Sequence, residues 1–268
     1  MADAHPNPST FAGNGAPLTA EGLSSAAGLL GCDVAAVGAV IEVETKGCGF
    51  LADRRPKILF ERHIFHRETA GRFDATAPDL SHPKGGGYGS GGAAQYPRLE
   101  RAMALDRDAA LRGASWGLGQ IMGFNAGLAG FADAPAMIAA FADSEDAQLA
   151  GLARFCTGSK LDKALREHRW ADFARGYNGP NFKENAYDAK LDAAWTRLSR
   201  DGPADLRFRA AQVYLMYLGF DPGPIDGQPG KRTARAMAAF ADRSGLPVSH
   251  ALDDATFGHL HRAAMDQP

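Results

Sequence analysis

The sequence predicts a mainly α-helical protein made of two domains. Between residues 18 and 200 apolar residues recur at helical spacing, and strand patterns are scarce, with 57–60 as one short candidate. The breakers Gly202 and Pro203 then mark a boundary, after which residues 205–264 are predicted to form a smaller unit. A chain of 268 residues is long enough for one large and one small domain. Residues 1–18 are expected to form a flexible arm before the large domain at 19–198.

Charge and composition exclude several classes of protein. The chain has 29 Lys and Arg against 31 Asp and Glu, a net charge of −2, whereas nucleic-acid-binding proteins normally carry a basic surplus. It shows neither a signal peptide nor a run of about 18 apolar residues. We therefore expect synthesis in the cytoplasm, no membrane insertion, no nucleic-acid partner and a monomer. Cys32, Cys48 and Cys156 have neither the spacing of a metal site nor the even number of a disulfide framework.

Residues 33–45 predict a helix that ends on a carboxylate. At about 100° per residue one side of this helix is apolar and consists of Val34, Val37, Val40 and Ile41. Glu44 falls on that side, whereas Glu42 faces away from it. A carboxyl group at that place is partly desolvated, which raises its pKa and suits it to donate a proton near neutral pH. The alternative is a helix-end glutamate that faces solvent or pairs with Lys46 or Arg54.

Glu61 is the nearest second carboxylate of the right type in sequence. Cleavage of a glycosidic bond usually needs two carboxyl groups, one to protonate the leaving oxygen and one to handle water or the positive charge that develops on the sugar. The alternative for Glu61 is a structural ion pair with Arg62 or Arg54. The nearby histidines His63 and His66 lack the glutamate and spacing of a zinc motif, so no metal site is expected.

Glycine is unusually frequent, at 32 of 268 residues, or about 12% against roughly 7% in average proteins. One cluster spans 85–92 and reads either as a mobile loop or as the wall of a cleft, with Tyr88 and Tyr96 available to stack on a sugar ring. A second glycine cluster spans 113–123, and its residues favour neither a helix nor a strand. Ser115 and Gln120 in it offer hydrogen-bonding groups beside a backbone that a ligand could approach. A third, at 176–179, reads as a turn.

Three of these motifs, taken in order, resemble the lysozyme superfamily. They are Ile-Glu-Val-Glu-Thr at 41–45, Ser-Trp-Gly-Leu-Gly-Gln-Ile-Met at 115–122 and Ala-Arg-Gly-Tyr-Asn-Gly at 174–179. Goose-type lysozymes and lytic transglycosylases share this order. The run Arg-Pro-Lys-Ile-Leu-Phe-Glu-Arg-His at 55–63 is similar to the N-acetylmuramidases found in endolysins of phages that infect Gram-negative bacteria. The resemblance covers about residues 18–198.

The resemblance implies a lysozyme-like fold in which Glu44 is the general acid. It places Ser115, Gln120, Tyr177 and Asn178 along the cleft that holds the glycan, and it requires no metal or organic cofactor. The second carboxylate does not follow from the resemblance, because lytic transglycosylases work with one; Glu61 is the candidate on physical grounds. Gly119 stands where lytic transglycosylases commonly carry a bulkier residue.

The C-terminal residues predict a compact helical unit. Core stripes run through 206–217 and 236–240, and Asp226-Gly227 with Gly230 and Thr233 predicts a turn that leads into a helix. This pattern resembles the three-helix peptidoglycan-binding domain, and its second turn, at 248–256, lacks the usual glycines. The alternative is a packing appendage that binds no ligand.

Taken together, the residues and the resemblance predict a peptidoglycan hydrolase that cleaves the β-1,4 bond between N-acetylmuramic acid and N-acetylglucosamine and so lyses bacteria. The alternatives are a lytic transglycosylase with 1,6-anhydro products and a non-catalytic wall-binding protein. Without an export signal, the enzyme would reach the periplasmic wall through a holin-type lesion, as endolysins do, or through a secretion system as a toxin.

Overall fold

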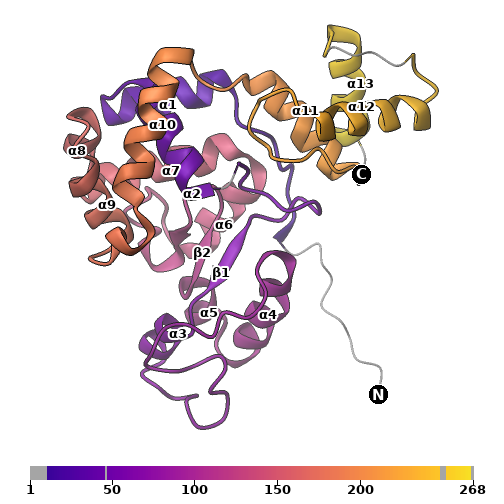
Figure 1. Ribbon diagram of the computed structural model, residues 1–268. Coiled ribbons are helices and arrows are strands. Elements are labelled where there is room, and N and C mark those ends of the chain that lie inside the picture. The colour runs from indigo at the N-terminus through magenta and orange to yellow at the C-terminus, as the bar shows by residue number, and fades with distance from the viewer. Residues whose placement is uncertain (1–10, 46, 248–251, 267–268) are drawn as a thin grey trace, which may run out of the picture.

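The computed structural model describes residues 11–45, 47–247 and 252–266 (Figure 1). The prediction of a mainly α-helical protein is confirmed. The helices are α1 (Ala20–Leu30), α2 (Val34–Thr45), α3 (Arg62–Glu68), α4 (Gln95–Leu105), α5 (Arg107–Arg112), α6 (Ala134–Asp143), α7 (Glu145–Gly158), α8 (Asp162–Arg166), α9 (Trp170–Asn178), α10 (Tyr187–Asp201), α11 (Leu206–Tyr217), α12 (Lys231–Arg243) and α13 (Asp254–Met265). Within the described ranges, no single helix is long and apolar enough to cross a membrane.

A small antiparallel sheet lies at the centre of the large domain. Its strands are β1 (Ile58–Phe60), β2 (Ala114–Trp116) and β3 (Ile121–Met122), paired in the order β1-β2-β3. Leu59 lies opposite Ser115, and Ser115 opposite Met122. In Figure 1, α3, α4 and α5 lie on one side of this sheet and α1, α7, α9 and α10 on the other, with the end of α2 pointing toward it. The sheet thus joins two groups of helices.

The helix α2 forms as its apolar pattern predicts. The Asp33 carboxylate accepts a hydrogen bond from the Ala36 backbone N–H at 2.7 Å and caps the first turn. Val37, Val40 and Ile41 are buried against α1 and α10. Glu42 faces outward as expected and forms an ion pair with Arg197 of α10. This orientation directs Glu44 inward.

The expectation of a flexible arm is wrong for residues 11–18; residues 1–10 lie outside the described part of the chain. Phe11 is 7% exposed, and its ring lies 5.5 Å from that of Tyr96 and 5.6 Å from that of Trp116. The Gly15 N–H donates to the carbonyl of Ala142 at 3.1 Å. Alternating Ala, Pro, Asn and Gly suggested mobility, but one buried aromatic ring and a short run of backbone hydrogen bonds hold this segment in the core.

The glycine-rich cluster at 85–92 is a loop held at several points. The Gln95 side chain donates to the carbonyls of Tyr88 and Ser90, both at 2.7 Å, and accepts from the Phe60 N–H at 3.1 Å. Arg62 donates to the carbonyl of Gly85 at 3.1 Å. These contacts fix the base of the loop beside β1.

The C-terminal unit consists of α11, α12 and α13 around its own core, as the three-helix pattern predicted. The Gln212 side chain organises its long turn, because its oxygen accepts from the N–H groups of Asp226 and Gly227 at 3.0 and 2.9 Å. Thr233 is buried and donates to the carbonyl of Pro222 at 2.7 Å. The unusual second turn begins at 248–251, which lies outside the described residues.

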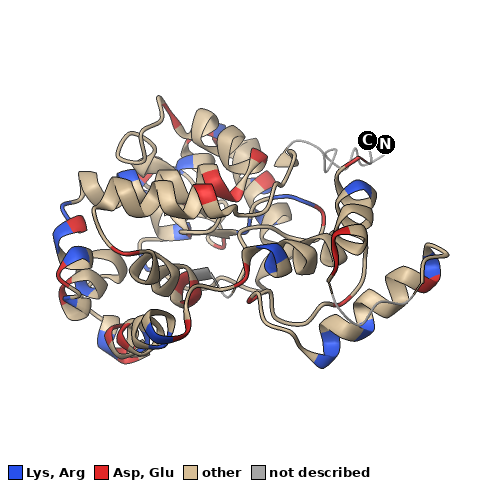
Figure 2. Ribbon diagram, turned by 90° about the horizontal axis from the view of Figure 1, so that it is seen from above, with Lys and Arg blue, Asp and Glu red and all other residues tan. Residues whose placement is uncertain are grey.

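Charged residues of both signs alternate along the helices in the view of Figure 2. α12 is the most basic helix, with Lys231, Arg232, Arg235 and Arg243 against Asp242. The net charge of −2 over the full sequence leaves little long-range electrostatic field from the molecule as a whole.

Candidate active site

Glu44 lies in the last turn of α2, at the end of the buried apolar face. Burial raises the pKa of its carboxyl group, and the Asn178 side-chain N–H, which donates to Oε1 at 3.0 Å, lowers it by less. Among the described residues no Lys or Arg forms an ion pair with Glu44; Lys46 lies outside them, and Arg54 instead donates to the carbonyl of Ala264. A carboxylic acid in this setting keeps its proton to higher pH than an exposed one, which a general acid needs.

Asn178 is the last residue of α9, and its side chain contacts Glu44. The chain turns away directly after it, at Gly179, whose φ of 86° suits glycine. The Oδ1 atom of Asn178 is buried and has no hydrogen-bond partner among the described residues. This oxygen is therefore a hydrogen-bond acceptor beside Glu44 whose capacity is unused.

Tyr177 connects Glu44 to the hairpin formed by β2 and β3. Burial raises its pKa well above the ordinary value, with further contributions from Cys156 and Glu44, so the phenol stays protonated. Its hydroxyl group donates to the carbonyl of Gly119. The ring stacks on Phe173 at 5.3 Å, which fixes its direction. Tyr177 therefore sets the position of the Gly119 backbone relative to the acid.

The hairpin turn at 117–120 presents Gln120. The segment predicted to be poor strand in fact pairs as β2 and β3, and only its turn is irregular, with positive φ at Gly117 (68°) and Gln120 (48°). The Ser115 hydroxyl donates to Oε1 of Gln120 at 2.9 Å, and Nε2 of Gln120 donates to the Gly117 carbonyl at 2.9 Å. Because Ser115 is only 5% exposed, it orients Gln120 and does not line a surface itself.

Glu61 belongs to a second group of residues. It directly follows β1, and its Oε2 lies 3.1 Å from Nδ1 of His63. Burial raises the pKa of Glu61, while His63 and a hydrogen bond from Tyr88 act in the opposite direction. The structure records no contact between Glu61 and Glu44, whose neighbours are Asn178 and Tyr177. The two carboxyl groups thus have separate surroundings.

The two tyrosines expected at the sugar differ in their environment. Tyr88 is 38% exposed and lies beside Glu61. Tyr96 is fully buried, and its hydroxyl donates to the Pro56 carbonyl at 2.7 Å, so the prediction that it stacks on a sugar is wrong. The glycine-rich sequence before Tyr96 does not reveal that this residue is buried. Its burial depends on Phe11 and Arg55, which cover the Tyr96 ring.

Two residues of the site had no signal in the sequence. The pKa of Tyr187, at the start of α10, is raised by burial and by Glu44, which places its phenol near the acid. Gln148 of α7 is buried and accepts from the Leu118 N–H at 2.6 Å, and this hydrogen bond holds the hairpin turn. A lone Gln inside a helix carries no recognisable motif. Among the described residues no group of three or more His, Cys, Asp or Glu is arranged to hold a metal ion.

Comparison with known proteins identifies the large domain. The family model for N-acetylmuramidase matches residues 33–199, more than half of the chain. The chain belongs to the N-acetylmuramidase family. A model for a putative peptidoglycan-binding domain matches residues 206–260. This muramidase with its peptidoglycan-binding domain is a peptidoglycan hydrolase, a glycoside hydrolase by reaction type.

A solved structure resembles this muramidase closely. It is described as the crystal structure of Burkholderia AP3 phage endolysin, with 46% sequence identity, a TM-score of 0.65, and coverage of 69% of this chain and 71% of that chain. A search of curated proteins gave no match. The lysozyme-like fold inferred from three short motifs is thereby confirmed.

Proposed function

We propose that this muramidase cleaves the β-1,4 bond between N-acetylmuramic acid and N-acetylglucosamine with Glu44 as the general acid. The observation that carries the proposal is the position of Glu44 at the end of a buried helix face, where desolvation raises its pKa and, among the described residues, an amide N–H is its one hydrogen-bond donor. The protonated carboxyl donates to the glycosidic oxygen as the bond from that oxygen to C1 of the muramic acid breaks. Water adds at C1 and releases a proton, which restores the acid.

Residues beside Glu44, in the hairpin turn and beside Glu61 are suited to hold the glycan. The Oδ1 atom of Asn178 has no partner among the described residues and is an acceptor for an N–H or O–H group of the sugar. Gln120, oriented by Ser115, lies in the hairpin turn. Tyr88 offers an exposed ring for stacking on a sugar face.

Glu61 is proposed as the second carboxylate, which guides water or stabilises the positive charge on the sugar. Its support is the burial that raises its pKa and its hydrogen bond with Tyr88. If Glu61 has this role, Glu61→Gln lowers kcat by about 10²-fold or more while binding of sacculi persists. Full activity of Glu61→Gln would leave Glu44 as the single catalytic carboxyl group.

The test of Glu44 uses a matched pair on one helix. Glu44→Gln removes the acid and keeps the shape, and we expect a loss of about 10²- to 10⁴-fold in kcat. Glu42→Gln makes the same chemical change two residues earlier, on the outward face, and should stay within about twofold of the wild type. The readouts are clearance of permeabilised Gram-negative cells and release of reducing sugars from sacculi. Equal activity of the Glu44 variant and the wild type would exclude Glu44 as the acid.

The products distinguish hydrolysis from the transglycosylase reaction. Hydrolysis leaves a reducing N-acetylmuramic acid, whereas intramolecular attack leaves a 1,6-anhydro end. Mass spectrometry of digested glycan strands reads the two ends directly, since they differ in mass by one water. We expect reducing ends.

The biological role is proposed from the likeness to a phage endolysin. The enzyme would act on the periplasmic wall after a holin-type lesion, as a monomer. Co-expression with a holin should then lyse cells, whereas expression alone should not. A dedicated immunity gene beside the coding sequence would instead indicate a toxin delivered by a secretion system.

A further inference from the structure

A buried ion pair joins the C-terminal unit to the large domain. Arg209, in the first turn of α11, is 3% exposed, and its guanidinium donates to both oxygens of Glu145, at 2.6 and 2.8 Å. Glu145, at the start of α7, is fully buried. Its two oxygens also accept from the N–H groups of Gly49 and Leu18, at 2.7 and 2.8 Å. Every polar atom of this pair is satisfied, which is the condition under which a buried pair holds a defined geometry.

The same guanidinium holds the chain segment that follows Glu44. Nε and Nη2 of Arg209 both donate to the carbonyl of Gly47, at 3.0 and 2.6 Å. Gly47 lies three residues beyond the acid, and Gly49 is bound by Glu145 on the other side. Gly47 and Gly49 are therefore both held by one ion pair, and half of that pair belongs to the C-terminal unit.

Packing reinforces this contact. Cys48 and Phe50 are fully buried and share a small core with Val213 and Ile225 of the C-terminal unit. A Cβ atom on Gly47 would lie 2.3 Å from the carbonyl oxygen of Ile225. The segment 47–50 thus has the C-terminal unit as one of its walls.

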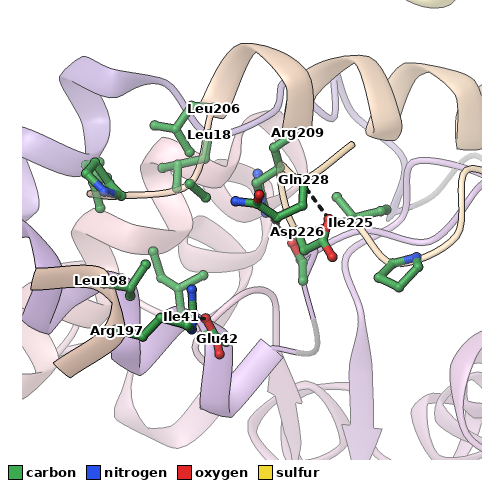
Figure 3. A pocket seen from close by; sticks show the side chains of 16 residues that line it. Leu18, Ile41, Glu42, Arg197, Leu198, Leu206, Arg209, Ile225, Asp226 and Gln228 are labelled. Carbon is green, nitrogen blue, oxygen red and sulfur yellow. Dashed lines mark hydrogen bonds and ion pairs between the residues drawn. The ribbon is translucent and has the colours of Figure 1, made fainter. Parts of the chain in front are cut away.

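A cavity shows where the two parts do not touch. Its volume is about 520 Å³, and it lies between α2, α10 and α11, with Ile41 and Leu198 on one side and Leu206 and Ile225 on the other (Figure 3). The contacts between the two parts include the bonds of Arg209 and the small core around Phe50.

A second route leads from the ion pair to the hairpin. Gln148 lies one turn after Glu145 on α7, and its oxygen accepts from the Leu118 N–H at 2.6 Å. A Cβ atom on Gly49 would lie 2.0 Å from that oxygen, so Gln148 contacts the segment after Glu44 as well as the turn that carries Gln120. The position of α7 affects both sides of the site.

We propose that the C-terminal unit is a structural part of the catalytic centre, in which Arg209 is a positioning residue that holds the end of the Glu44 helix through Gly47 and Glu145. The inference rests on the proposed role of Glu44. A tethered wall anchor would change activity only on insoluble walls. A unit that positions the acid also determines turnover of short soluble glycan strands, for which anchoring to a wall is irrelevant.

The test uses the full chain with two variants of the pair. Arg209→Lys keeps the charge opposite Glu145 but loses the planar fork that serves both Glu145 and Gly47. Arg209→Met with Glu145→Gln removes both charges. Arg235→Met changes an exposed arginine of α12 in the same unit and is the matched control. The assays are kcat and KM on soluble uncross-linked glycan strands, co-sedimentation with sacculi, circular dichroism, and the pH dependence of kcat.

We expect kcat of the Arg209 variants to fall by about 10- to 100-fold, as for a small misplacement of a catalytic group, with KM and sacculus binding within about threefold. The alkaline limb of the pH profile should move to lower pH, because a displaced Glu44 is better hydrated and loses its proton earlier. The control should match the wild type. A merely structural role would lower the folded fraction and leave this limb in place.

Wild-type kcat and an unmoved alkaline limb in a folded variant would overturn the proposal. Failure of both variants to fold would overturn it too, since Arg209 would then serve the fold as a whole. Glu44→Gln is measured in the same series. If it remains active, the proposed function fails; if it is inactive while the Arg209 variants behave as wild type, only the present inference fails.

Discussion

Gly47→Ala tests the contact between the two parts at a single atom. The φ of Gly47 is 102°, and an added Cβ would lie 2.3 Å from the Ile225 carbonyl oxygen and 3.1 Å from its carbon. The left-handed backbone alone costs about 1–2 kcal/mol for an alanine. Displacing a packed backbone adds about 1–3 kcal/mol. We therefore expect the free energy of unfolding to fall by about 2–5 kcal/mol.

Gly219→Ala supplies the matched control. Gly219 has a φ of 82° and belongs to the same C-terminal unit, but nothing lies within 4 Å of its added Cβ. It should lose only the backbone contribution, about 1–2 kcal/mol. Calorimetry measures the difference in stability between the two variants, because each kcal/mol shifts Tm by about 2–4 °C in a chain of this size. In the Gly47 variant, kcat on soluble strands should also fall, because Glu44 lies three residues away.

Equal losses of stability in the two variants would refute this reasoning. It would mean that the Ile225 loop moves away from Gly47 at no cost, so that the C-terminal unit does not fix the segment after Glu44. A stability difference without any change in kcat would mean that packing at Gly47 affects stability but not the position of Glu44.

Three further predictions follow from individual contacts. Phe11→Ala should lower the free energy of unfolding by about 3 kcal/mol in urea titrations, since the ring is buried against Tyr96, whereas a residue of a mobile arm would have no effect. Asn178→Leu removes the N–H that lowers the pKa of Glu44, so the acid should stay protonated to higher pH, and the alkaline limb of kcat should move upward. Burial raises the pKa of Glu145, and its arginine partner outweighs this, so its pKa lies below the ordinary 4.5. The stability that this pair contributes is complete above that value and is lost as pH falls below it, and Glu145→Gln should flatten this acid dependence in urea titrations.

Each of these predictions has an outcome that would contradict it. Unchanged unfolding of the Phe11 variant would contradict its place in the core. A limb that stays in place in the Asn178 variant would mean that the limb belongs to another group. If the Glu145 variant keeps the wild-type slope of stability against pH, other carboxyl groups cause the acid dependence.

The helix that ends at Glu44, α2, could be predicted from the sequence almost completely. The spacing of Val37, Val40 and Ile41 determines which face is buried, and the same geometry directs Glu44 inward and Glu42 outward. These features depend only on the helical repeat, which is a local property of the chain. The core of the C-terminal unit follows from the same kind of pattern.

Contacts between distant residues could not be predicted in this way. Tyr96 was expected at a sugar and is buried, because Phe11 covers it from a segment that looked mobile. Arg209 and Glu145 are 64 residues apart, and each is an ordinary charged residue of a helix in the sequence. No local repeat marks such partners.

The sequence by itself determined the helical class, the family motifs, and the acid at the end of an apolar helix face. Each of these depends on residues within a few turns of one another. Only the tertiary structure decided what surrounds the acid: the amide of Asn178, the backbone at Gly119, and the ion pair that brings the C-terminal unit against Gly47. The physical reason is that burial and charge pairing depend on which distant segments fold together.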